Sequence, residues 1–272
     1  MIFEQKDGDI MNLESPIGVF DSGVGGLTVL NELISRLPFE NFIYIGDTKN
    51  SPYGEKDNDT IASYVSNIVK YFENKGVKQV VIACNTATVN SSHLINETNL
   101  DIIGVVQPTA LKAINTTITK RVLILATSAT IRNGIYQKLL SEQKINAFAV
   151  ACPKFVPLIE KNMLNTPESF AVVKEVCEPY KDLKIDTVVM GCTHYGLLAN
   201  EIRQVMGNVN IITSGEATYY VVKDRLKKRN LLNNSQKHGE IKLLTTGSVE
   251  VFKKSIGWFK NRIDALEHVS LE

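Results

Sequence analysis

Short apolar runs rich in β-branched residues alternate with longer amphipathic segments along the whole sequence. Each run has the length of one strand, and each intervening segment has room for a helix. This alternation predicts an α/β fold with mostly parallel sheets, because parallel strands need crossover helices and are covered on both faces. The expected strands are 17–20, 42–46, 80–83, 102–106, 122–126, 147–151, 187–191, 209–212 and 241–245.

The clearest expected helix lies between the second and third strands. Its apolar residues recur at helical spacing: Ile61, Tyr64, Val65, Ile68, Val69 and Phe72. Gly76 then ends the helix, because glycine readily adopts the left-handed conformation found after helix ends.

The chain of 272 residues is long enough for two domains, and its halves repeat loosely. A strand followed by a polar residue and serine occurs at 18–23 and again at 123–129. We therefore expect two similar doubly wound α/β domains. The first comprises residues 16–108 plus 213–265 and the second residues 109–212, with 1–15 as an N-terminal extension outside the fold. A single large sheet is the alternative.

Polar motifs follow the expected strands at the points where helices begin. They are Asp21-Ser22-Gly23, Asp47-Thr48, Cys84-Asn85-Thr86, Thr127-Ser128 and Cys192-Thr193-His194. In open α/β sheets, ligands bind at this carboxyl edge. Two such edges facing each other would enclose a cleft, so we expect the active site between the domains.

Two of the four cysteines stand out by position. A lone cysteine beside a strand is usually just buried, and Cys152 and Cys177 keep that interpretation. Cys84 and Cys192 instead lie at strand ends among polar residues. A helix start there is expected to lower the thiol pKa from about 8.5 towards neutrality. Such thiols can accept and donate a proton on opposite sides of one carbon.

Other chemistries fit these segments less well. A zinc site built from Cys84, Cys192 and His194 lacks typical ligand spacing within each segment, so we expect no metal. The glycines at 23–26, with Asp47 about 20 residues further on, resemble a dinucleotide fingerprint, but Thr28 stands where the third glycine belongs. These glycines also fit tight turns and close backbone approach.

Three further residues have both an ordinary and a functional interpretation. Tyr53 and Gly54 lie in the loop "SPYGEK", which is either a simple turn or presents donors to a carboxylate. Glu160 is by default a surface charge on a helix. His194 could assist the neighbouring thiol as an acid or base.

Charge and composition point away from several partner classes. The net charge is +1 with 44% apolar residues, so no large field favours nucleic acid or an anionic membrane. The N-terminal residues lack the apolar core of a signal peptide, and no apolar run approaches the roughly 20 residues of a membrane span. We expect a cytoplasmic protein with reduced thiols that requires neither nucleic acid nor membrane.

Five segments in order, "FDSGVGGLTV", "IGDTKNSPYG", "ACNTAT", "CPKFVPLIE" and "GCTHYGLL", resemble glutamate racemases of the aspartate/glutamate racemase superfamily. The resemblance extends from Pro16 to about Phe259. It implies interconversion of L- and D-glutamate by two thiols, with no cofactor. It also implies a role in supplying D-glutamate for peptidoglycan of the cell wall, and a homodimer.

The resemblance also assigns roles to individual residues. Cys84 would remove the α-proton of D-glutamate and Cys192 that of L-glutamate, assisted by Asp21 and His194 respectively. The implied substrate-binding residues are Asp21, Ser22, Tyr53, Gly54, Asn85, Thr86, Thr193 and His194. Asp47, Thr130 and Glu160 match positions that support the site.

The sequence departs from the family pattern at Ala129, Asn133, Gly196 and Thr213. These changes bear on turnover and domain dynamics more than on reaction type, because both thiols are present. Within the superfamily, an aspartate racemase is the alternative, although His194 argues against it. A two-lobed amino-acid-binding protein is the non-enzymatic alternative, and a nucleotide-dependent enzyme ranks last.

Overall fold

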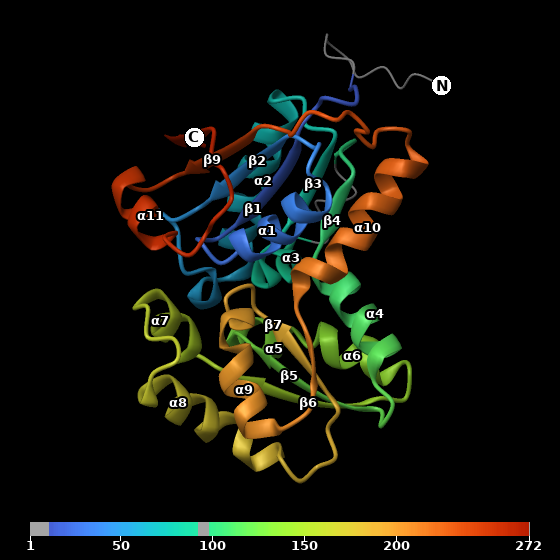
Figure 1. Ribbon diagram of the computed structural model, residues 1–272, viewed down its shortest axis with the longest axis vertical. Coiled ribbons are helices and arrows are strands. Elements are labelled where there is room, and N and C mark those ends of the chain that lie inside the picture. Colours follow the sequence, from blue (N-terminus) through green and yellow to red (C-terminus); the bar gives the residue numbers. More distant parts are fainter. Residues whose placement is uncertain (1–10, 92–97, 272) are drawn as a thin grey trace.

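Parallel strands form two separate sheets in the computed structural model, which describes residues 11–91 and 98–271 (Figure 1). The first sheet has the order β10-β9-β2-β1-β3-β4, and the second has the order β6-β5-β7-β8. The first contains β1 (Ile17–Asp21), β2 (Phe42–Gly46), β3 (Gln79–Ile82), β4 (Ile102–Gly104), β9 (Ile241–Thr245) and β10 (Ala265–His268). The second contains β5 (Arg121–Ala126), β6 (Asn146–Ala151), β7 (Thr187–Gly191) and β8 (Asn210–Ile212). The predicted α/β class with parallel sheets is confirmed, and the single-sheet alternative is wrong.

Helices cover the faces of both sheets, and apolar clusters pack on either side of each sheet. The helices are α1 (Leu27–Arg36), α2 (Asn58–Asn74), α3 (Asn85–Asn90), α4 (Val106–Thr116), α5 (Ser128–Asn133), α6 (Ile135–Ser141), α7 (Phe155–Glu160), α8 (Pro167–Cys177), α9 (Ala199–Met206), α10 (Ser214–Lys228) and α11 (Val249–Ser255), with 3-10 turns η1 (Tyr53–Glu55), η3 (Glu178–Tyr180) and η4 (Tyr195–Leu198). None of the helices in the described ranges is both long and apolar enough to cross a bilayer.

Helix α2 shows how the sequence sets an element's limits. Asp57 caps its start by accepting a hydrogen bond from Thr60 N at 2.8 Å. The predicted apolar stripe is buried apart from Tyr64, which is partly exposed. Gly76 has a φ of 62° just beyond the end. The capping residue and the terminal glycine thus fix a helix that the apolar spacing already predicts.

The chain passes between the sheets at two places. It leaves the first sheet after β4, where α4 begins at Val106 and packs on β7 and α6 of the second sheet. It returns through α10, which packs on α1 and α4. The predicted strand 102–106 is therefore too long, because its last residue already belongs to the crossover helix. The predicted domain limits are close to these crossings and stay a prediction.

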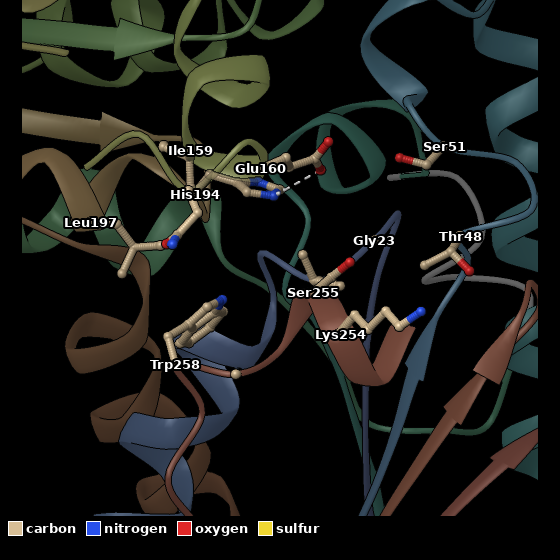
Figure 2. A pocket seen from close by; sticks show the side chains of 13 residues that line it. Gly23, Thr48, Ser51, Ile159, Glu160, His194, Leu197, Lys254, Ser255 and Trp258 are labelled. Carbon is tan, nitrogen blue, oxygen red and sulfur yellow. Dashed lines mark ion pairs between the residues drawn. The ribbon is translucent and has the colours of Figure 1, made fainter. Parts of the chain in front are cut away.

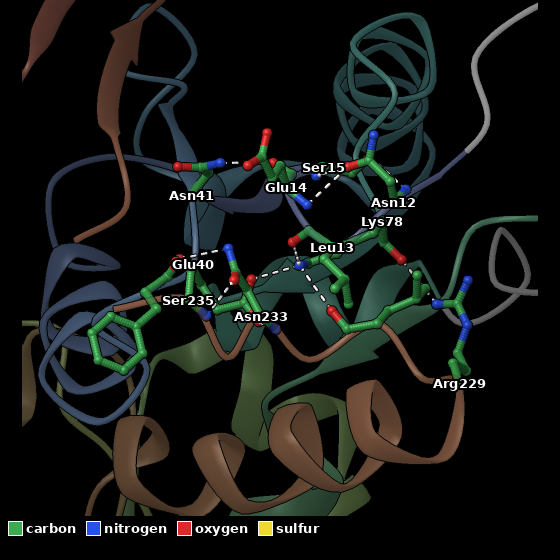
Figure 3. A network of polar contacts seen from close by, with 12 residues as sticks. Asn12, Leu13, Glu14, Ser15, Glu40, Asn41, Lys78, Arg229, Asn233 and Ser235 are labelled. Atoms are coloured by element: carbon green, nitrogen blue, oxygen red, sulfur yellow. Dashed lines mark hydrogen bonds and ion pairs between the residues drawn. The ribbon is translucent and has the colours of Figure 1, made fainter. Parts of the chain in front are cut away.

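A buried lysine ties the segment before the first strand to the sheet (Figure 3). The side chain of Lys78 is fully buried and donates to Leu13 O at 2.6 Å and Leu231 O at 2.9 Å. Its Nζ also lies 2.6 Å from Glu40 Oε2, as an ion pair. Of the expected N-terminal extension, residues 12–15 are therefore attached to the fold, while residues 1–10 lie outside the described residues.

Candidate active site

A cavity of about 380 Å³ lies between the two sheets and is lined by residues that follow strands of both. Each of the four predicted catalytic residues lines it: Cys84, Cys192, Asp21 and His194. So do the predicted binding residues Ser22, Tyr53, Gly54, Asn85, Thr86 and Thr193, together with Glu160. Their individual roles stay predictions, but the fold brings them to one place.

Cys84 caps the start of α3 directly after β3. Its Sγ accepts a hydrogen bond from Ala87 N at 3.4 Å and lies 3.7 Å from Ser22 Oγ, and the residue is 6% exposed. Burial and the nearby Asp21 charge raise the thiol pKa, and the Ala87 N–H does not compensate. The expectation of a lowered pKa is wrong for this thiol, because desolvation outweighs the start of a six-residue helix.

Cys192 follows β7 and contacts His194, which in turn contacts a carboxylate. The distance from Cys192 Sγ to His194 Nδ1 is 3.9 Å. On the other side of the ring, Nε2 lies 3.3 Å from Glu160 Oε1, as an ion pair without the alignment of a hydrogen bond. Burial alone lowers the pKa of His194, but Cys192 and Glu160 outweigh it and raise the pKa to about 10. These two neighbours therefore favour the charged form of the imidazole.

Figure 2 shows the Glu160–His194 pair from a second cavity of about 670 Å³. Both residues line this cavity as well as the thiol cavity, so their contact stands between the two. Trp258 and Lys254, from the C-terminal part of the first sheet's unit, line the far side. The Glu160 side chain is 46% exposed, which means that water reaches the carboxylate end of the pair.

Asp21 joins the two halves of the site at the end of β1. Its Oδ2 accepts a hydrogen bond from Gly26 N at 2.6 Å and another from Thr193 Oγ1 at 3.2 Å. Thr28 Oγ1 donates to Thr193 O at 3.0 Å. The carboxylate is buried, and its charge acts on Cys84 through space rather than through a hydrogen bond.

The glycines after β1 are required by close packing. A Cβ on Gly25 would lie 2.5 Å from Thr193 Oγ1 and closer still to His194 Nδ1. A Cβ on Gly26 would collide with Asp21. Gly25 therefore lets the loop after β7 approach the loop after β1, and Gly26 lets the turn pack against Asp21, as expected of glycines that allow close backbone approach.

Asp47 lies beneath the site instead of in it. Its carboxylate accepts hydrogen bonds from Tyr53 Oη at 2.5 Å, Thr246 Oγ1 at 2.6 Å and Asn50 Nδ2 at 3.1 Å. Asp47 is 1% exposed and does not line the cavity. Because these partners occupy its carboxylate, Asp47 is unsuited to bind a ribose. The hydrogen bond to Asp47 also holds the Tyr53 hydroxyl away from any substrate carboxylate. Tyr53 can contribute to the cavity only through its ring and backbone.

Asn85 and Thr86 place polar groups on the cavity wall just after Cys84. Asn85 Nδ2 is buried and has no hydrogen-bond partner among the described residues. Thr86 Oγ1 lies 3.1 Å from Thr127 Oγ1, across the boundary between the two sheets. Thr130 donates its N–H to Thr127 Oγ1 at 3.3 Å and does not line the cavity, so it can only support Thr127.

Sequence reasoning missed several wall residues. Cys152, predicted to be simply buried, is 1% exposed but also lines the cavity, whereas Cys177 lies in the core of the second sheet. The other missed wall residues are Ser51, Pro52, Glu55, Pro153, Val156, Pro157 and Tyr195. Only its family resemblance linked the segment "CPKFVPLIE" to the active site, because apolar residues of a cavity wall cannot be distinguished from core residues in the sequence.

Two of the departures from the family pattern are neighbours in space. A Cβ on Gly196 would lie 3.2 Å from Thr213 Cγ2. Thr213 precedes α10 and makes no side-chain cap. Asn133 Nδ2 donates to Val89 O at 3.4 Å, between α5 and α3, whereas nothing in the structure explains the change at Ala129. Within the described residues, no group of three or more His, Cys, Asp or Glu side chains is arranged to hold a metal ion.

The family model for Asp/Glu/Hydantoin racemase matches residues 38–219, more than half of the chain. This match defines the class of protein. A glutamate racemase from Bacillus cereus is 37% identical over 267 residues, covering 96% of this chain and 99% of the relative. A solved glutamate racemase isoform from Bacillus anthracis superposes with a TM-score of 0.89 at 34% identity, covering 94% of this chain and 98% of that one. The glutamate racemase from Francisella tularensis, solved with D-glutamate, gives a TM-score of 0.85 at 29% identity, covering 96% and 99%. The chain belongs to the glutamate racemase family.

Proposed function

We propose that the protein interconverts L- and D-glutamate with Cys84 and Cys192 as its two proton-transferring groups. The observation that carries the proposal is that two buried thiols, each just beyond the end of an interior strand of a different sheet, line one cavity. A single base cannot easily return a proton to the face opposite the one from which it was taken. Two thiols on opposite walls can do so.

The proton transfers balance within one turnover. With D-glutamate, the Cys84 thiolate removes the α-proton while the Cys192 thiol donates a proton to the opposite face of the α-carbon. The enzyme then holds a Cys84 thiol and a Cys192 thiolate, which is the form that accepts L-glutamate. For another turnover in the same direction, the Cys84 thiol loses a proton to solvent and the Cys192 thiolate gains one, so no net acid or base is consumed.

Neighbouring charges support each thiol differently. The charged His194 ring, 3.9 Å from Cys192 Sγ, stabilises negative charge on that sulfur. Asp21 and burial raise the pKa of Cys84, which makes its thiolate a stronger base towards a weakly acidic α-proton. The carbanion formed next to a carboxylate needs preorganised donors, and Asn85 Nδ2 is the buried unpartnered donor on this wall.

We also propose a metabolic role, a cellular location and an oligomeric state for the protein. D-glutamate made by the protein would supply peptidoglycan synthesis in the cytoplasm. A homodimer is consistent with an apolar surface on the packed helices α4 and α10, where Leu111 is 56% exposed and Tyr220 is 54% exposed. This dimer would be lost in dilute solution if Leu111 were replaced by a charged residue, as measured by light scattering.

The experiment compares three cysteine variants with the native protein, using L-glutamate, D-glutamate and aspartate without added cofactor. Cys84→Ala and Cys192→Ala are expected to abolish racemisation and to keep the fold. Cys177→Ala is the matched control, because Cys177 is an equally buried thiol outside the cavity. Full activity in either active-site variant would contradict the assigned roles. Glutamate binding without racemisation by the native protein would instead indicate a binding protein, and conversion of aspartate alone would indicate the sister activity.

A further inference from the structure

Tyr136, at the start of α6, touches the loops that carry both thiols. Its Oη donates a hydrogen bond to Asn85 Oδ1 at 2.7 Å, and Asn85 directly follows Cys84. Its ring carbon Cε2 lies 3.4 Å from the position that a Cβ on Gly191 would take, and Gly191 directly precedes Cys192. We propose that Tyr136 is a positioning residue for racemisation, which orients the Asn85 amide and fixes the spacing of the two thiol loops.

The hydrogen bond determines which end of the Asn85 amide is left without a protein partner. The phenol proton occupies Oδ1, so the Nδ2 group is turned to the side where no protein partner exists among the described residues. Because a buried donor without a partner is costly, this arrangement suits a site that supplies an acceptor from a ligand. The reversed amide would present oxygen to a substrate carboxylate and repel it.

The Tyr136 phenol remains a hydrogen-bond donor to Asn85 throughout the neutral pH range. Tyr136 is fully buried, and burial raises its pKa well above the usual range of tyrosine. It therefore keeps its proton and stays a donor. Since Tyr136 does not line the cavity, it acts through Asn85 rather than on the substrate.

The position of Tyr136 links the two halves of the protein. Gly134, with a φ of 76°, lies between α5 and α6 and allows the turn that directs Tyr136 inward. Helix α6 packs on β6 and α4, so the ring is held by the second sheet's unit. The hydroxyl reaches Asn85 on the first sheet's unit. The hydrogen bond from Tyr136 to Asn85 thus fixes the orientation of the amide and connects the two units that carry Cys84 and Cys192.

The test is a double-mutant cycle on Tyr136→Phe and Asn85→Ala, and the inference rests on the proposed function. Losing an oriented hydrogen bond to a charged ligand corresponds to about tenfold to a hundredfold in kcat/KM, so Tyr136→Phe is expected to lose that much for glutamate. The double variant is expected to be no slower than Asn85→Ala, because the phenol acts through the amide. Tyr219→Phe is the matched control, since this buried tyrosine accepts from Lys223, does not line the thiol cavity and should keep native activity.

The outcomes separate this inference from the function on which it rests. A native protein that does not racemise glutamate refutes the proposed function. If the native protein racemises glutamate, two results would refute the inference alone. The first is a Tyr136→Phe variant with native kcat/KM, and the second is a double variant in which the two single losses of kcat/KM multiply. If Tyr136→Phe does not fold, Asn85→Asp provides the test, because the carboxylate still accepts from the phenol but offers no donor. We expect Asn85→Asp to fold and to be as inactive as Asn85→Ala, and near-native activity would overturn the inference.

Discussion

The contact between Glu160 and His194 predicts how the alkaline limit of activity responds to one substitution. The proposed mechanism uses a charged His194 ring beside Cys192, and Cys192 and Glu160 raise the pKa of His194 to about 10. Two unit charges 3.3 Å apart attract by about 1.3 kcal/mol in water. Because the Glu160 side chain is 46% exposed, the value typical of solvent-exposed pairs, about 0.2–1 kcal/mol, applies. Glu160→Gln should therefore lower the pKa of His194 by about 0.2 to 0.7.

The assay is the pH dependence of kcat/KM between about pH 7 and pH 11, which reports ionisations of the free enzyme and free substrate. The substrate amine titrates identically for every variant, so the difference between native and Glu160→Gln isolates His194. The matched control is Glu175→Gln, which removes an exposed ion pair with Lys154 in the same half of the protein. An unchanged alkaline limb, or a shift of several pH units, would refute the reasoning. The first result would mean that the pair does not act on His194, and the second that it is not screened by water.

Three further predictions follow from packing and charge. Lys78→Met leaves Glu40 buried without its cation and should lower the free energy of unfolding by about 3–5 kcal/mol in urea titrations, whereas a small effect would show that water reaches the pair. Asp186 has a pKa of about 2, because hydrogen bonds outweigh the opposing effect of burial. Its stabilisation is present above the unfolded pKa of about 3.9, so the melting-temperature gap between native and Asp186→Asn should close as the pH falls from about 4 through 2. Gly25→Ala forces a methyl group against His194 and should reduce kcat/KM by about tenfold or more, whereas native activity would show that the loops can separate freely.

Much of the fold could be predicted from the sequence, because strand-length apolar runs and helical spacing are local signals. The nine predicted strands all exist, with ends shifted by up to two residues. Strand β10 was missed because Ala265–His268 is short and half-polar, and lies at the edge of its sheet beside β9. Such a strand is held by a neighbour distant in sequence, so nothing in its own residues shows it.

The site residues could be named from strand-end motifs and family resemblance, but their partners could not. The sequence places Asn85 after a strand, yet only the fold brings Tyr136 to its amide from the other half. In the same way, Asp47 has the spacing of a ligand-binding acid, while the fold surrounds it with Tyr53 and Thr246. Contacts between residues far apart in the chain decide these roles.

The direction of the Cys84 pKa could not be predicted from the sequence either. The start of a helix is a local feature that favours a thiolate, whereas desolvation depends on how deeply the folded chain buries the sulfur. In the structure the residue is 6% exposed and the burial effect is the larger one. The folded environment therefore favours the protonated thiol, and the thiolate that the proposed mechanism uses is a stronger base for that reason.

The proposal that Cys84 and Cys192 act on opposite faces of one substrate carbon is tested most directly by following where solvent deuterium enters. The native protein is incubated with L-glutamate in D2O, and both enantiomers are analysed at low conversion. Two separate thiols predict α-deuterium in the newly formed D-glutamate and α-protium in the remaining L-glutamate. D-glutamate that retains the substrate's own α-proton would contradict the account, because one group would then have carried that proton from one face of the carbon to the other.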